Sequence, residues 1–135
     1  AQSFGRSQSV FNFFRPGYTP PNTPIASAGL LAPEFQITNE LSVIAFINFM
    51  QPIIQNGIGD VRANYAEISA LANDSAALVD EVNLVLAAGQ LSATTVAAIR
   101  AAVDSIATTA TNATLNRVYT AILLTLASPE YITLK

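Results

Sequence analysis

The chain has no histidine, cysteine or tryptophan, and only 11% of its 135 residues are charged. Without histidine it has neither the commonest general base nor the commonest metal ligand, so Ser-His-Asp and Cys-His catalysis are impossible within this chain. Without cysteine, disulfides and thiolate metal sites are excluded. The sequence therefore predicts no catalytic residue, no cofactor site and no metal site.

The chain has few charged residues, and they are scattered along its length. Six basic residues are spread along the whole length and the net charge is −3, so there is no basic run that could collect phosphates, and no nucleic-acid binding is expected. The longest apolar stretches, residues 43–49 and 119–127, are far shorter than the roughly 20 residues of a membrane-spanning helix. Two interpretations of the weakly charged surface remain open: an uncharged polar exterior outside the cytoplasm, or a surface buried against other protein.

The first 37 residues are rich in proline and aromatic residues. Five of the seven prolines lie there, which predicts an extended and turned segment rather than helix. Within it, the aromatic side chains in and around FNFF are too numerous for a solvated tail. We expect them to act as packing anchors on the helices that follow or on a partner chain; they are Phe11, Phe13, Phe14 and Tyr18.

After residue 37 the apolar residues recur with helical spacing. Helices are predicted over about 39–55, 61–72, 75–88, 93–107 and 111–127, followed by one further turn that begins at Pro129. Thr38, Asp74, Ser92 and Ser128 are the expected N-caps. The predicted fold is all-α: a bundle of about five helices in residues 38–135, preceded by the extended segment of residues 1–37. The first helix is apolar on nearly every face, which is typical of a buried helix.

One polar cluster stands out in the sequence. Arg15, Glu34 and Glu40 are charges within apolar or turn-forming sequence. The structural interpretation is that Arg15 holds the extended segment to one of the two glutamates by a bidentate ion pair. The alternative is a carboxylate-binding or acid–base site, which the absence of a nearby histidine or lysine disfavours.

Three sequence blocks stand in order along the chain: residues 9–18 (SVFNFFRPGY), 31–37 (LAPEFQI) and 127–131 (ASPEY). Together with residues 80–90 (DEVNLVLAAGQ) they resemble the C-terminal part of the DUF1800 family. The resemblance implies a bacterial protein longer than 135 residues, an extracytoplasmic location, and a chain that is the C-terminal portion of a larger domain. It brings no established catalytic residues.

Three functions are compatible with these observations. The first is a structural or protein-interaction module whose partner is the upstream part of the same protein, another protein chain or a second copy. The alternative is a non-catalytic part of an enzyme whose active residues lie upstream. A second alternative, favoured by the low charge and the Ala/Thr-rich helices, is a self-assembling surface or filament subunit.

Overall fold

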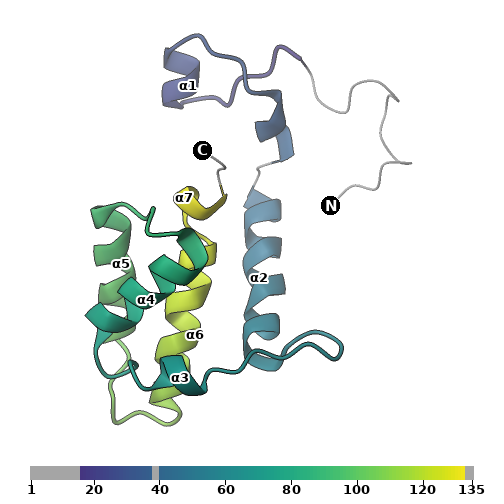
Figure 1. Ribbon diagram of the computed structural model, residues 1–135. Coiled ribbons are helices and arrows are strands. Elements are labelled where there is room, and N and C mark those ends of the chain that lie inside the picture. Colours follow the sequence, from purple (N-terminus) through teal and green to yellow (C-terminus); the bar gives the residue numbers. More distant parts are fainter. Residues whose placement is uncertain (1–15, 38–39, 133–135) are drawn as a thin grey trace. The chain divides into compact units, whose positions relative to one another are not determined.

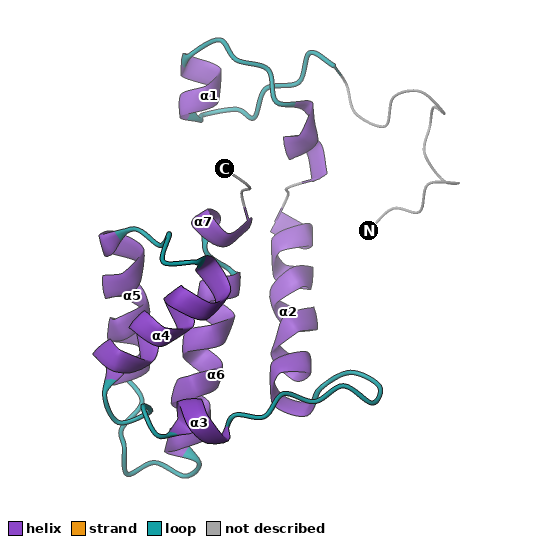
Figure 2. Cartoon of the chain, viewed as in Figure 1, coloured by secondary structure: helices purple, strands orange, loops and turns teal. Residues whose placement is uncertain are grey.

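The computed structural model describes residues 16–37 and 40–132, and every regular element within those ranges is a helix (Figure 1). The all-α prediction is therefore confirmed for the described part of the chain, where extended pairing is limited to an isolated antiparallel bridge between Ile58 and Val61 (Figure 2). The chain divides into two units, residues 1–46 and 47–135, with the boundary inside the helix α2.

In the first unit, the described residues form two short helices and the start of α2 (Glu40–Asn56). Helix α1 (Pro24–Ser27) and the 3-10 helix η2 (Pro33–Ile37) each begin at a proline. Proline suits the first helical position, where its missing N–H would have no intrahelical partner. The expectation of a wholly extended and turned segment was therefore incomplete, because two of its prolines start helical turns instead of preventing them.

Helix α2 agrees closely with the predicted helix at 39–55. It continues past Pro52 to Asn56 and stops where Gly57 takes a positive φ of 78°. The N–H of Gly57 donates a hydrogen bond to the carbonyl of Ile53 at 2.8 Å, which uses one of the carbonyls left free at the end of the helix.

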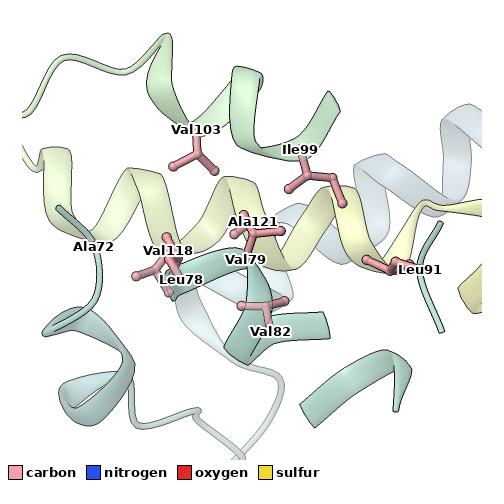
Figure 3. Close-up of a cluster of buried hydrophobic side chains, with 9 residues drawn as sticks. All are labelled: Ala72, Leu78, Val79, Val82, Leu91, Ile99, Val103, Val118 and Ala121. Carbon is pink, nitrogen blue, oxygen red and sulfur yellow. The ribbon is translucent and has the colours of Figure 1, made fainter. Parts of the chain in front are cut away.

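The second unit is a bundle built around α6 (Ala113–Leu126). Two longer helices, α4 (Ser75–Ala87) and α5 (Ala93–Asp104), pack on α6 and on each other, and the short α3 (Ala66–Ser69) and α7 (Pro129–Ile132) also contact it. Figure 3 shows the side chains that fill the space between these elements. The core consists of Ala72, Leu78, Val79, Val82, Leu91, Ile99, Val103, Val118 and Ala121.

Three of the predicted N-caps are confirmed, and the fourth, Thr38, lies outside the described residues. The carboxylate of Asp74 accepts hydrogen bonds from the N–H groups of Ala76 and Ala77, and the hydroxyl of Ser92 accepts from the N–H of Thr95. The hydroxyl of Ser128 accepts from the N–H of Tyr131 at the start of α7. Each cap satisfies a backbone donor that the first helical turn leaves without an intrahelical partner.

The predicted helix at 61–72 was wrong in its extent, because only Ala66–Ser69 is α-helical. Upstream of it the chain turns at Gly59, whose φ is 56°, and forms the bridge between Ile58 and Val61. The side chain of Asn64 then accepts a hydrogen bond from the N–H of Ala66, which starts the helix late. Local side-chain and glycine chemistry here prevails over the apolar spacing.

Candidate interaction surface

Most residues singled out in the N-terminal segment lie outside the described residues; they are Phe11, Phe13, Phe14 and Arg15. The backbones of Glu34 and Glu40 lie in η2 and at the first position of α2, but their side chains are not among the described ones. Tyr18 is half-buried, and its carbonyl accepts a hydrogen bond from the N–H of Ala32 at 2.9 Å. The ion pair of Arg15 with either glutamate therefore stays a prediction.

Helix α2 exposes large apolar side chains, which corrects the expectation that this apolar helix is buried. Val43, Ile44 and Phe49 are 47%, 56% and 57% exposed, and Ile54 is the one described residue of α2 that is buried. Apolar side chains occupy more faces of this helix than the rest of the chain buries. Residues 41–55 also contain no charged side chain. Helix α2 therefore exposes large apolar side chains that point in different directions around its axis, at about 100° per residue; we call them together the α2 surface: Val43, Ile44 and Phe49.

The C-terminal end of α2 is held by a tyrosine. The hydroxyl of Tyr65 donates a 2.7 Å hydrogen bond to the carbonyl of Ile54. The ring of Tyr65 meets that of Tyr119 edge-on, with centroids 5.4 Å apart and planes at 71°, an arrangement that aromatic pairs prefer. Burial, and to a smaller degree the neighbouring Tyr119, raises the pKa of Tyr65 above its ordinary value of 10.0. The phenol therefore stays protonated and donates at neutral pH.

A cavity of about 300 Å³ lies between this end of α2 and α6. None of its lining side chains is charged, and several are amides or hydroxyls; the lining residues are Gln51, Ile54, Gln55, Ile106, Asn116, Tyr119, Thr120 and Leu123. An ion moved from water into such a site would lose its hydration without gaining a counter-charge. The cavity is therefore suited to uncharged groups, and the phenol of Tyr119 is the one group in its lining that could exchange a proton.

Helix α4 also exposes large apolar side chains. Leu84 and Val85 are 63% and 67% exposed. The buried face is centred on Leu78, Val79 and Val82. At about 100° per residue, Val85 falls at the edge of that face. Val79, rather than Val85, takes the inner position.

The most buried charge is Arg117, which the sequence analysis did not single out. The residue is 3% exposed. Its guanidinium donates to the carbonyls of Ala72, Val103 and Ile106 and to the carboxylate of Asp104. These four bonds use nearly all of the five N–H donors of an arginine. Arg117 is thus occupied by the protein itself and has little left for a ligand.

Glu130, in the ASPEY block, is a second charge with a structural role. One carboxylate oxygen accepts hydrogen bonds from the N–H of Ser92 at 3.2 Å and from the hydroxyl of Thr95 at 2.8 Å. These bonds, at the positive end of the α5 dipole, lower the pKa of Glu130 to about 2. A group so acidic is ionised at neutral pH, so it caps α5 and is unsuited to proton donation there.

Within residues 16–37 and 40–132, acidic residues do not gather in the groups of three or more that could hold a metal ion. In the same part of the chain, no helix has the length and apolar character required to cross a membrane. The described structure thus offers exposed apolar surface and an uncharged cavity, while its most buried charge is paired within the protein.

Comparison with known proteins gives a family and no function. A family model described as a protein of unknown function (DUF1800) matches residues 1–133. The chain belongs to the DUF1800 family. No curated protein and no solved structure matches this DUF1800 chain. Of the blocks that carry the resemblance, ASPEY has a clear structural role here, because Ser128 caps α7 and Glu130 caps α5.

Proposed function

We propose that this DUF1800 chain is a structural and protein-interaction module, the C-terminal helical part of a larger extracytoplasmic bacterial protein. The exposure of the α2 surface supports the proposal most directly. A helix that exposes several large apolar side chains leaves apolar area in contact with water, and large exposed apolar areas are typical of surfaces that bind other proteins. The occupant of the α2 surface is other protein, either from the same larger protein or from a separate chain.

The chemistry of α2 suits the centre of a protein–protein interface. Such centres are depleted in charge and enriched in aromatic residues and methionine. Residues 41–55 carry no charge and include Phe49 and Met50. Burying this helix would cost no desolvation of an ion, and each buried apolar side chain would contribute roughly 1.5–3 kcal/mol before the entropic cost of association.

Self-association is a second candidate, favoured by the low charge of the whole chain. With 11% charged residues and a net charge of −3, little electrostatic repulsion keeps two copies apart. A second copy would use the same α2 surface. The two candidates are therefore separated by stoichiometry, not by the residues involved.

The test compares two exposed apolar side chains of similar accessibility. Phe49→Gln removes the apolar group from α2, and Leu84→Gln is the matched control on α4. We expect light scattering of the wild-type chain to show concentration-dependent association, or calorimetry to show no cooperative melt without a partner. Phe49→Gln should weaken the association where it occurs, and Leu84→Gln should not.

The contrary outcome is equally concrete. A monodisperse species near 14.2 kDa at high concentration, with a cooperative melt, would mean that the chain is self-sufficient. The proposal then fails. Equal effects of Phe49→Gln and Leu84→Gln on association would show that non-specific hydrophobic contacts, and not α2 in particular, drive the association.

A further inference from the structure

The cavity between the end of α2 and α6 has the size of a small ligand site. Its volume of about 300 Å³ is at the lower end of the roughly 300–1,000 Å³ that ligand pockets in proteins enclose. All of its lining residues belong to the second unit, so the site lies within one unit of the chain. Gln51, Gln55 and Asn116 are exposed, so the cavity opens to solvent beside them.

Two helices bring neutral polar side chains to the cavity in pairs. Gln51 and Gln55 are four residues apart on α2, and Asn116 and Thr120 are four residues apart on α6. Side chains at this spacing are neighbours on one face of a helix. Among the residues that the structure describes, the side chains of Gln51, Gln55 and Thr120 have no hydrogen-bond partner. Their donors and acceptors are therefore available to a ligand.

Tyr65 holds both walls of the cavity without being part of its lining. Its hydroxyl donates to the carbonyl of Ile54, a lining residue of α2. Its ring packs edge-on against Tyr119, a lining residue of α6. One side chain thus fixes the two walls relative to each other before a ligand enters, and such preorganisation lowers the entropic cost of binding.

The lining limits the chemistry of the ligand in two ways. An ionic ligand would lose its hydration and gain no counter-charge, because no lining residue is charged. A wholly apolar ligand would remove water from the amides and hydroxyls of the lining without replacing their hydrogen bonds, so its binding is disfavoured. The suitable ligand is uncharged, carries several groups that both donate and accept, and has an apolar face for Ile54, Ile106 and Leu123.

We propose that the cavity binds a neutral sugar ring, either free or as one unit of a glycan. Each sugar hydroxyl both donates and accepts, and a carboxamide does the same through its N–H and C=O groups, so two adjacent hydroxyls can bind one amide. The C–H groups of the ring supply the apolar face. A peptide has only one N–H and one C=O per residue, and within this volume it satisfies fewer of the amides. The proposal is independent of the partner of the α2 surface, whose residues do not line the cavity.

Saturation-transfer NMR on the 135-residue chain tests the proposal, because it observes the ligand and tolerates self-association of the protein. The probes are glucose, galactose and mannose. We expect at least one of them to bind with a Kd on the order of 1–10 mM. The corresponding uronate, which adds a carboxylate to the same ring, should bind at least about tenfold more weakly. The methyl glycoside of the sugar that binds keeps its affinity if the ligand is a unit of a glycan and loses it if the ligand is a free sugar.

Matched variants locate the binding. Gln51→Met and Gln55→Met replace an amide by an apolar side chain of similar length at exposed positions, and at least one should weaken sugar binding about tenfold. Gln90→Met makes the same change between α4 and α5, outside the lining, and should leave the Kd unchanged. Circular dichroism checks that each variant keeps its helices.

Three results would overturn the proposal. The first is that no sugar shows saturable binding up to about 100 mM. The second is that Gln51→Met and Gln55→Met both bind the sugar as the wild type does, which would place it elsewhere on the chain. The third is that a neutral peptide, acetyl-trialanine amide, binds more tightly than every sugar, which would make the cavity a peptide site.

Discussion

Arg117 and Asp104 form an ion pair in which one partner is buried and the other is not. Nη2 of Arg117 lies 3.0 Å from Oδ1 of Asp104, with side-chain exposures of 4% and 58%. The remaining bonds of the guanidinium go to backbone carbonyls before α4 and at the end of α5. One side chain of α6 thus donates to carbonyls before α4 and at the end of α5, of which the carbonyl of Val103 also accepts from the N–H of Ile106, and the ion pair is the smaller part of its role.

Replacing Arg117 should be among the most damaging single changes. Arg117→Met keeps an unbranched apolar stem but leaves buried carbonyl groups without donors, so we expect a loss of about 3–5 kcal/mol in the free energy of unfolding. Urea denaturation followed by circular dichroism measures it. Asp104→Asn is the control, with an expected loss below about 1 kcal/mol because that carboxylate is exposed. Equal losses would show that the ion pair, and not the hydrogen bonds to backbone carbonyls, accounts for the contribution of Arg117 to stability.

The core of the second unit depends on α4. Leu78 is fully buried and Leu84, on the same helix, is 63% exposed. We expect Leu78→Ala to cost about 2–5 kcal/mol through lost burial and a residual cavity. Leu84→Ala should change stability by no more than about 0.5 kcal/mol, since surface substitutions seldom do more. Urea midpoints of the two variants test the assignment of the inner face, and similar midpoints would contradict it.

Sequence reasoning found the helices where two signals agreed. At α4 and α5, apolar spacing and a capping side chain both mark the helix start, and Asp74 and Ser92 cap as expected. It failed at 61–72, where apolar spacing stood alone and Asn64 and the glycine turn decided the local structure. Apolar spacing indicates which residues are buried and not which backbone conformation they adopt. It therefore predicts helices that are too long where a turn is nearby.

The contacts of the charged side chains were harder to predict from the sequence than the fold. A lone arginine in the amphipathic pattern of α6 looks like a solvent-exposed residue, and the carbonyls that bind Arg117 come from residues 11–45 positions away. Glu130 lies in the first turn of α7, and its carboxylate binds the start of α5. Such contacts depend on tertiary packing, and one sequence carries no local signal for them.

The hydrogen bond that holds the C-terminal end of α2 can be removed by deleting one oxygen atom. Tyr65→Phe removes the hydroxyl that donates to Ile54 and leaves the ring against Tyr119. We expect a loss of about 0.5–1.5 kcal/mol, typical of one hydrogen bond. Amide hydrogen exchange should quicken in the last turns of α2 and stay unchanged in α5. Equal protection of α2 in both proteins would show that the hydroxyl does not hold it.

The pH dependence of stability should report the Glu130 cap. The pKa of Glu130 is lowered to about 2 from 4.5, chiefly by hydrogen bonds from Ser92 and Thr95, so between these values the unfolded chain binds a proton that the folded chain does not. The carboxylate therefore stabilises the fold above about pH 4.5, and this contribution is lost as the pH falls toward 2. Wild type should exceed Glu130→Gln in urea midpoint at pH 7, and the difference should shrink between about pH 5 and pH 2.

The control for this measurement is Glu81→Gln, which removes an exposed carboxylate from α4. At pH 7 its urea midpoint should lie close to that of wild type, because Glu81 is exposed and surface substitutions seldom change stability by more than about 0.5 kcal/mol. A carboxyl NMR titration gives an independent value, expected near 2 for Glu130. If the Glu130→Gln difference is instead constant from pH 7 to pH 2, the carboxylate is not held at the α5 N-terminus in solution, and the ASPEY block would need another structural role in this chain.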